Sequence, residues 1–227
     1  MARDEPPGTR KPSAGQPVYR PDIFDVDDLD RARQIILTPE PKTTTDERWE
    51  RETPFLVRCI LEHLAPGRGD VVLDYGCGVG RLARELIRQA GCDVLGVDIS
   101  RRMRSLAVDY VDSPRFTVLS PRMFETLIAK GLRVDHGIAV WVLQHCHSPD
   151  RDIALIAAAL AAGHRLFVVN GRQRCVPSDR GWVNDRLDIA ALLALRFTAT
   201  GDVAFESPAV SPELAQSSFA RIYAKAG

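Results

Sequence analysis

The sequence predicts an α/β protein built on a mostly parallel sheet with helices on both faces. Five short apolar runs alternate with segments of helical period between residues 71 and 169. The runs are continuously apolar, which is typical of strands buried on both faces of a sheet. Two further runs, 197–206 and 218–225, follow with no expected helix between them. They predict an antiparallel pair at the sheet edge.

The order of elements follows from caps and spacing. The expected strands cover 71–73, 94–97, 116–119, 137–143 and 165–169, and the expected helices cover 81–89, 100–109, 121–129, 150–162 and 185–195. Upstream, apolar residues recur at helical spacing from Trp49 to Leu61, after a start signal at Asp46. Because Pro54 interrupts this stretch, we expect two short helices there.

Composition narrows the class of protein. Thirty Lys and Arg residues balance thirty Asp and Glu residues, so bulk charge argues against nucleic-acid binding. The longest nearly apolar run, 153–163, is too short to span a bilayer, and we expect no membrane span. Five cysteines without a C-x-x-C pair argue against a disulfide framework or a zinc site. They favour a reducing cytoplasm.

Three regions are expected along the chain. Residues 1–22 combine five prolines with mixed charge and little apolar surface, which indicates a disordered tail. This start has the pattern of neither a secretory signal nor a membrane anchor. Residues 23–64 are expected to form an N-terminal helical lid or cap, and residues 65–227 the main domain.

A glycine-rich turn carries the chemistry. Asp74-Tyr75-Gly76-Cys77-Gly78-Val79-Gly80 follows the first expected strand and leads directly into a helix. Such a turn at the carboxyl edge of a parallel sheet indicates a nucleotide site. Asp98 closes the next strand, where a carboxylate suits ribose hydroxyls. Asp74 would repel a pyrophosphate and favour a cationic ligand. S-adenosylmethionine carries an ammonium, a sulfonium and no phosphate.

On these residues, the sequence resembles the class I S-adenosylmethionine-dependent methyltransferases. The matching segments are VLDYGCGVGRLAREL at 72–86, VLGVDISRRMRSLA at 94–107 and DHGIAVWVLQHC at 135–146. The resemblance covers about residues 45–225. It implies a Rossmann-like seven-stranded sheet in the order 3-2-1-4-5-7-6, with strand 7 antiparallel and helices on both faces. It also implies S-adenosyl-L-methionine as cofactor and S-adenosyl-L-homocysteine as product.

The resemblance further implies which residues bind the cofactor. The glycine-rich turn would line the methionine part, Asp98 would hold the ribose hydroxyls, and the residues after it would pack on the adenine or ribose. The loop after the third strand would close over the adenine, and the exit of the fourth would lie beneath the transferring methyl. The expected cofactor residues are Asp74, Gly76, Cys77, Gly78, Asp98, Ile99, Met103, Ser120, Trp141 and Gln144.

The catalytic and acceptor residues are open to two interpretations each. His145 is the candidate general base, because a free imidazole titrates near neutrality; the alternative is a structural or cofactor-contacting histidine. Histidines 136, 145 and 147 span a strand and a loop, and we expect no metal. The candidate acceptor residues are Trp49, Arg172, Arg174 and Trp182. Their alternatives are an amphipathic helix face and an ordinary surface crossover.

The leading hypothesis is a methyltransferase acting on an O or N nucleophile of a small-molecule, glycan or lipid-linked acceptor. The first alternative is a non-catalytic cofactor-binding or scaffold protein with the same fold. The second is a protein methyltransferase. A third, an NAD-dependent oxidoreductase, conflicts with Asp74 and with the G-x-G-x-G spacing of the turn. The sequence leaves the acceptor, the methylated atom and the oligomeric state open.

Overall fold

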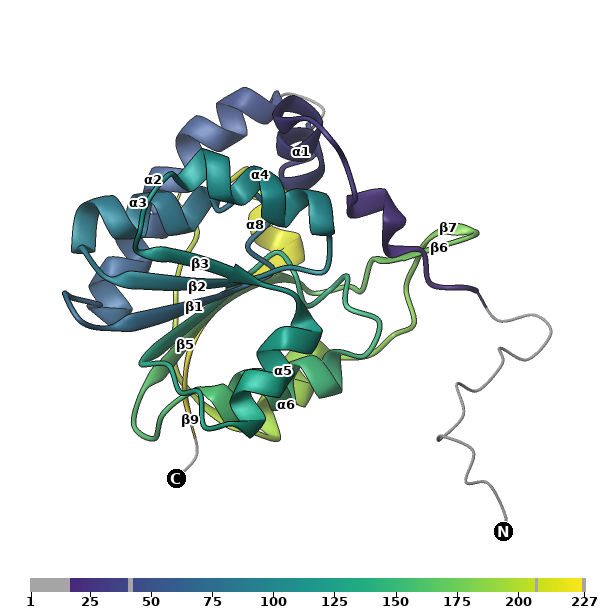
Figure 1. Cartoon of the computed structure of the whole chain (residues 1–227). Helices are drawn as coiled ribbons and strands as arrows, with labels where there is room; N and C mark the ends of the chain where they lie inside the picture. The colour runs from purple at the N-terminus through teal and green to yellow at the C-terminus, as the bar shows by residue number, and fades with distance from the viewer. Residues whose placement is uncertain (1–16, 41–42, 207, 226–227) are drawn as a thin grey trace, which may run out of the picture.

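One seven-stranded sheet forms the centre of the computed structural model, which describes residues 17–40, 43–206 and 208–225 (Figure 1). Its order is β3-β2-β1-β4-β5-β9-β8, and only β9 runs antiparallel to β5 and β8. With β8 and β9 as the sixth and seventh strands, this confirms the expected order. The strands are β1 (Val71–Tyr75), β2 (Asp93–Val97), β3 (Phe116–Leu119), β4 (His136–Val140), β5 (Arg165–Gly171), β8 (Phe197–Asp202) and β9 (Ser218–Lys225).

The helices cover both faces of the sheet, as expected (Figure 1). They are α1 (Leu29–Ile36), α2 (Thr45–Leu64), α3 (Arg81–Ala90), α4 (Arg101–Val111), α5 (Pro121–Ala129), α6 (Pro149–Ala159), α7 (Ile189–Ala194) and α8 (Pro212–Ser217), with a short 3-10 helix η1 (Pro21–Phe24). Within the described ranges, none of these helices combines the length and the apolar character needed to cross a membrane.

Three expectations about the elements were wrong. Residues 45–64 form one helix through Pro54, because Glu52 before it and Phe55 and Ile60 after it are all buried in the same helix packing. Burial on both sides stabilises the helix across the hydrogen bond that Pro54 cannot donate. The fourth strand ends at Val140 rather than residue 143, because Trp141 takes a left-handed backbone with φ of 57°.

The third wrong expectation concerns the segments after β5. A small hairpin, β6 (Val176–Ser178) and β7 (Gly181–Val183), lies between β5 and α7. The helix α8 lies between the last two strands, where no helix was expected. It starts on a short cap signal, because Ser211 accepts a hydrogen bond from Leu214 N and Pro212 follows at the first helical position.

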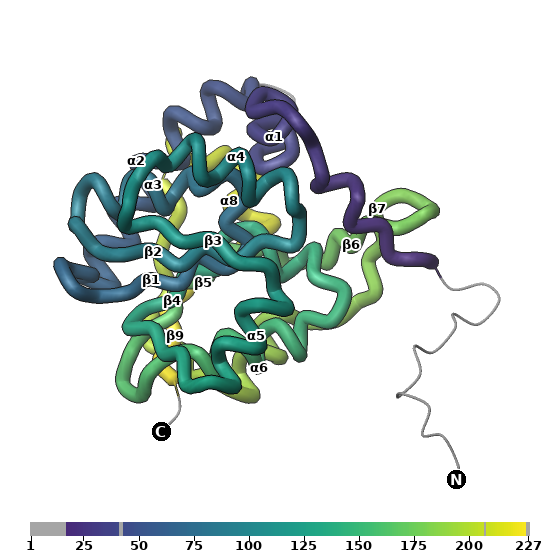
Figure 2. The backbone as a smooth tube through the Cα atoms, in the orientation of Figure 1, coloured from purple at the N-terminus to yellow at the C-terminus, as the bar shows by residue number. Residues whose placement is uncertain are grey.

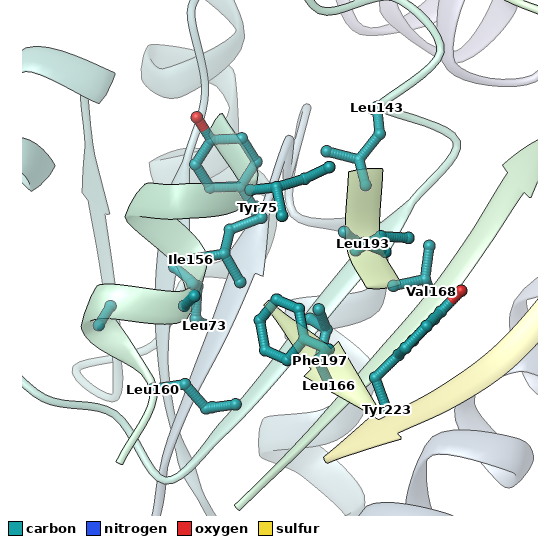
Figure 3. Close-up of a cluster of buried hydrophobic side chains, with 14 of the residues drawn as sticks. Leu73, Tyr75, Leu143, Ile156, Leu160, Leu166, Val168, Leu193, Phe197 and Tyr223 are labelled. Carbon is teal, nitrogen blue, oxygen red and sulfur yellow. The ribbon is translucent and has the colours of Figure 1, made fainter. Parts of the chain in front are cut away.

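Neighbouring residues of each strand face opposite layers of the core. Leu73, Ala139 and Val168 pack with α5, α6 and α7, and Figure 3 shows this layer around Leu73, Ile156 and Leu193. The alternate positions, such as Val72 and Ile138, pack with α2 and α3 on the other face. Each fully buried aliphatic side chain contributes about 1.5–3 kcal/mol. This two-sided burial explains the continuously apolar strands.

Residues 23–64, expected to form one N-terminal lid, contribute to two different parts of the structure. Residues 1–16 of the expected tail lie outside the described residues, while Tyr19 forms a bridge with Ser178 of the β6–β7 hairpin. Helix α2 packs in the sheet core, with Leu56 and Ile60 almost fully buried. Residues 17–36 instead pass over the carboxyl ends of the strands. We call residues 17–36 the N-terminal strap.

Candidate functional site

A cavity of about 680 Å³ opens at the carboxyl ends of β1, β2 and β4. The glycine-rich turn after β1, the end of β2 and the exit of β4 form its floor. The strap contributes Tyr19, Phe24 and Ile36, and the first turn of α6 contributes Arg151 and Asp152. The cavity therefore lies at the edge of the sheet where parallel α/β proteins bind ligands.

The glycine-rich turn depends on glycine at two cavity positions. Gly76 and Gly78 have φ values of 80° and 54°, a region that L side chains rarely adopt. A Cβ on Gly76 would lie 2.3 Å from Val142 Cγ2, and one on Gly78 would lie 2.8 Å from Ile36 Cδ1. Gly76 N also donates to Val97 O over 2.7 Å. The turn is thus packed closely on β2, the β4 exit and the strap.

Asp98 is held at the end of β2 by two backbone donors. Its Oδ2 accepts from Gly78 N over 2.9 Å, and its Oδ1 accepts from Ser100 N over 2.8 Å. Burial raises the pKa of Asp98, and these two N–H groups oppose that shift. Ile99 beside it is exposed in the cavity wall. The carboxylate keeps free lone pairs for hydroxyl donors of a ligand.

Asp74 and Arg81 bring opposite charges to the same cavity. Asp74 is almost fully buried, and burial raises its pKa to about 7, against the lowering effect of Arg81. The Arg81 guanidinium is also buried and donates to Thr53 Oγ1 over 3.1 Å, with its carbon 5.5 Å from the Trp49 ring centroid. Among the described residues, it forms no other side-chain hydrogen bond. A buried guanidinium with unused donors favours an anionic ligand group.

Arg81 was not among the site residues predicted from the sequence. One signal for it was available: Arg81 is the first residue of α3, where a positive charge opposes the helix dipole. Helix α2 holds it there, since Thr53 accepts its hydrogen bond. Burial lowers the pKa of Arg81, and the nearby buried Glu52 opposes that shift. Glu52 itself pairs with Arg48, over 2.5 Å. That support comes from a distant segment and is visible only in the fold.

His145 lies in the cavity wall with both ring nitrogens engaged. Its Nδ1 lies 2.6 Å from Cys175 O, and its Nε2 lies 3.2 Å from Gln144 Nε2. Burial lowers the pKa of His145, the hydrogen bond to Cys175 O opposes that shift, and Arg174 lowers the pKa further. His147 also lines the cavity and stacks on Tyr19, with ring centroids 4.9 Å apart. No hydrogen bond to the His147 ring forms within the part of the chain that the structure describes.

Most of the expected cofactor residues meet in this cavity, and two do not. Asp74, Gly76, Cys77, Gly78, Asp98, Ile99, Met103 and Trp141 line it. Ser120 caps α5, its hydroxyl accepting from Met123 N over 3.3 Å, and it is not among the lining residues. Gln144 likewise does not line the cavity, because its side chain turns to Gly171 and His145.

The expected acceptor residues do not gather in one place. Arg174 is buried and donates to Leu143 O, Cys146 O and the Asp185 carboxylate, so its guanidinium ties loops together. Arg172 is exposed and does not line the cavity. Trp49 packs against Tyr110 and the core around Met103. Trp182 alone lies near the mouth, its ring 5.4 Å from that of His145.

The strap is attached at two places, and Figure 2 shows its course, in purple, from beside the β6–β7 hairpin to α1. Near its start, Val18 N donates to Asp179 Oδ1 and Arg20 N donates to Pro177 O, over 2.9 and 3.0 Å. After η1, Asp25 Oδ1 accepts from Ser100 Oγ and Arg102 N, over 2.7 and 3.0 Å. Tyr19 and Phe24, between these two attachments, face the cavity.

Within the described ranges, no group of three or more His, Cys, Asp or Glu side chains is arranged to hold a metal ion. The five cysteines are free thiols. Burial raises the pKa of Cys77 and Cys146, both of which line the cavity, so neither is poised as a thiolate.

Comparison with known proteins shows similarity to methyltransferases. Residues 72–163 match a family model described as a methyltransferase domain. Methyltransferase GfsG of Streptomyces halstedii is 34% identical over 117 residues, 49% of this chain and 41% of that protein. The tRNA U34 carboxymethyltransferase of Alcanivorax borkumensis is 30% identical over 152 residues, 62% of this chain and 44% of that protein. The chain spans about two-fifths of the length of these relatives.

A solved structure extends the likeness over the fold. The magnesium protoporphyrin IX methyltransferase of Synechocystis PCC 6803, solved with bound S-adenosylhomocysteine, superposes with a TM-score of 0.62. The match covers 90% of this chain and 97% of that one, at 20% identity. At this identity the likeness concerns the fold.

Proposed function

We propose that this chain transfers a methyl group to an O or N nucleophile of a small acceptor, because it carries a class I S-adenosylmethionine-dependent methyltransferase domain. The observation that carries the proposal is that the buried Asp74 and Arg81 line the same cavity. A carboxylate and a guanidinium in one cavity complement the ammonium and carboxylate of an amino acid. The methionine part of the cofactor has both groups.

The other residues of the cavity fit the rest of that cofactor. Gly76 and Gly78 leave room for close approach of the ligand to the backbone. Asp98, fixed by two N–H donors, is oriented to accept from ribose hydroxyls. The exposed Ile99 side chain offers an apolar surface to the adenine, as does Pro121 across the cavity.

Bound S-adenosylmethionine supplies a methyl group on a positively charged sulfur and becomes S-adenosylhomocysteine after transfer. The chain contributes mainly orientation: the turn and Asp98 fix one reactant, and the strap and β4 exit bound the space for the other. Holding two reactants in line for attack contributes up to about 7–11 kcal/mol to the lowering of a barrier. Tyr19 and Phe24 of the strap also limit the access of water.

The shape of the cavity supports a small-molecule acceptor over a folded macromolecule. The strap passes over the cavity and is fastened on both sides, which narrows the approach. The walls near the β4 exit combine aromatic and apolar side chains, such as Tyr19, Phe24 and Leu155, with the charged Arg151 and Asp152 of α6. The geometry does not support an acceptor bound by the arginines of residues 171–185, since the Arg174 guanidinium already donates to Leu143 O and Asp185. Glycan and lipid-linked acceptors small enough to enter stay within the proposal.

The cellular setting belongs to the same proposal. Five free thiols, three of them buried, are typical of proteins in a reducing compartment, and we assign the chain to the cytoplasm on that basis. The balanced net charge supports an acceptor other than nucleic acid.

Calorimetric titration with S-adenosylhomocysteine, with NAD as control, tests the cofactor. We expect micromolar binding of the first, none of the second, and loss of binding in Asp98→Ala. Absence of binding to folded protein would contradict the proposal. Binding without transfer to any acceptor in a screen with labelled methyl donor would instead favour the non-catalytic alternative.

Arg81→Met separates the methionine subsite from the adenosine subsite. Hydrogen bonds to charged groups contribute about 1.5–3 kcal/mol, so we expect the affinity for S-adenosylhomocysteine to fall roughly 10- to 100-fold. Methylthioadenosine lacks the amino-acid part and should bind the variant as it binds the parent protein. Equal losses for both ligands would mean that Arg81 acts on the fold rather than on the carboxylate.

A further inference from the structure

The loop that leaves β4 is tied to the end of β5 by an amide of known orientation. Gly171 N donates to Gln144 Oε1 over 2.7 Å, and a backbone N–H requires an oxygen at that position. Gln144 Oε1 is therefore the atom facing Gly171, and the Gln144 NH2 group faces the other way. The Gln144 backbone is fixed as well, since Gln144 N donates to Asn170 Oδ1 and Gln144 O accepts from Cys175 N.

The orientation of this amide decides the protonation of the neighbouring ring. The Gln144 NH2 group lies 3.2 Å from His145 Nε2, and it can only donate, so Nε2 must accept. On the other side of the ring, Nδ1 lies 2.6 Å from Cys175 O. A carbonyl oxygen can only accept a hydrogen bond, so Nδ1 must carry the proton. Both partners therefore select one form of His145: neutral, with the proton on Nδ1.

The surroundings of the ring oppose the charged form. An imidazolium would direct a second N–H at the Gln144 NH2 group, leaving two donors opposed. Phe24 from the strap and Trp182 from the hairpin contact the ring without supplying charge, at centroid distances of 5.8 and 5.4 Å. The charged group acting on His145 is Arg174, a cation under the same loop. The lowered pKa of His145 agrees with this arrangement.

We propose that Gln144 is a positioning residue that holds His145 as the neutral Nδ1–H tautomer and occupies its Nε2 lone pair. With that lone pair engaged, His145 forms a fixed wall of the acceptor site and does not act as the general base. The role as an acceptor wall rests on the proposed function, whereas the tautomer follows from the hydrogen bonds alone. The ring offers its face and carbon edges to the cavity. A proton lost by an acceptor leaves to water or to His147, which lines the same cavity without a hydrogen-bond partner in the described chain.

Long-range proton–nitrogen NMR spectra of protein labelled with 15N-histidine test the tautomer directly. Such spectra distinguish a protonated from a bare ring nitrogen, and His145→Gln and His147→Gln identify the two signals among the five histidines. We expect a protonated Nδ1 and a bare Nε2 on His145, unchanged as the pH falls from about 8 to about 6. A proton on Nε2, or titration of His145 in that range, would overturn the proposal.

Gln144→Glu tests the positioning role. It replaces the NH2 donor with a carboxylate oxygen, so the midpoint of the His145 titration should rise by about 1–3 pH units. Gln173→Glu is the matched control, because it adds the same charge to the following loop at an exposed position. An unchanged midpoint in folded Gln144→Glu would show that Gln144 is merely structural. If this variant does not fold, the spectrum of the parent protein still decides the tautomer.

Titration of the same samples with S-adenosylhomocysteine distinguishes a failure of the proposed function from a failure of the inference about Gln144 and His145. Loss of cofactor binding in the parent protein would contradict the proposed function, while the NMR signals of His145 would still report its tautomer. Cofactor binding with the wrong tautomer would leave the proposed function standing and remove the inference about Gln144 and His145.

Discussion

Asp74 and Asp98 end neighbouring strands, yet their surroundings give them different roles. Asp98 accepts two backbone N–H groups, which favour its ionised form. Among the described residues, no hydrogen bond reaches the Asp74 carboxyl, and burial raises its pKa to about 7. Asp74 therefore responds to the charge of a ligand, while Asp98 is already fixed before a ligand arrives.

The raised pKa of Asp74 predicts a pH-dependent affinity. The carboxyl is mostly neutral at pH 6 and mostly ionised at pH 8, and only the ionised form attracts the ammonium of S-adenosylhomocysteine. Since one pH unit corresponds to a tenfold change for one proton, we expect about tenfold tighter binding at pH 8 than at pH 6. Calorimetry checks this, and Asp74→Asn should remove the difference. A pH dependence equal in both proteins would assign it to another group.

The same carboxyl should destabilise the unliganded fold. Its pKa is raised in the folded state, so the folded chain binds more protons than the unfolded chain between about pH 4 and about pH 7. The free energy of unfolding therefore falls as the pH rises through this window. Asp74→Asn should raise the denaturation midpoint more at pH 8 than at pH 5. The reverse order would contradict the raised pKa.

At the scale of elements, the glycine-rich turn and the strap position the site in different ways. The turn is fixed by backbone geometry, because Gly76 combines a positive φ with a close approach to Val142. Residues 17–28 of the strap are fixed by polar contacts at their two attachments, whereas α1 packs on the apolar cluster around Met103. Exposed polar contacts contribute little free energy, so residues 17–28 are expected to open before α1.

Gly76→Ala should disrupt the turn. A left-handed alanine costs about 1–2 kcal/mol, and crowding against Val142 adds about 1–3 kcal/mol. We expect a clear loss of thermal stability together with loss of S-adenosylhomocysteine binding. Gly131→Ala is the matched control, because Gly131 also has a positive φ of 98° but has nothing within 4 Å of an added Cβ. Similar losses in both variants would argue against a special role for the turn.

Asp25→Ala should release the strap from α4. It removes the acceptor for Ser100 Oγ and Arg102 N, so amide hydrogen exchange over residues 17–28 should become faster. Asp22→Ala is the control, since Asp22 pairs with Arg20 inside the strap. Equal exchange in the two variants would count against the attachment. The Arg102 N–H and the Ser100 hydroxyl hold the pKa of Asp25 below its usual range, so the attachment should be lost only as the pH falls through that lowered value.

At the scale of the whole molecule, one cavity joins elements that are far apart in the sequence. The strap, the turn after β1, the β4 exit and α6 all contribute to its lining. A ligand that contacts all of them binds the folded chain and not the unfolded chain. Its binding free energy therefore adds to the stability of the whole fold.

S-adenosylhomocysteine should accordingly raise the melting temperature. A ligand at 100 times its dissociation constant adds about 2.7 kcal/mol, which corresponds to roughly 5–10 °C for a chain of this length. Differential scanning fluorimetry, with NAD as control, measures the shift. A folded chain with no shift, or an equal shift with NAD, would contradict the cofactor assignment.

The sequence by itself determined the alternation of strands and helices, the glycine-rich turn and the acid after the second strand, while the order of the strands followed from the resemblance to a family. The first three features depend on local chemistry: buried strands are continuously apolar, a left-handed turn needs glycine, and Asp98 lies at a strand end. The single helix through Pro54 could not be predicted from local sequence patterns, because the tertiary packing of residues on both sides of the proline stabilises it.

Only the tertiary structure decided which polar groups meet. Arg81 reaches the cavity because Thr53 of α2 holds it, across 28 positions of the sequence. Arg174 does not contribute to the expected acceptor site, because its guanidinium donates to the carbonyls of Leu143 and Cys146. His145 is directed by Gln144 and Cys175, whose orientations depend on β5. A side chain's charge is written in the sequence, but its hydrogen-bond partners depend on which segments the fold brings together.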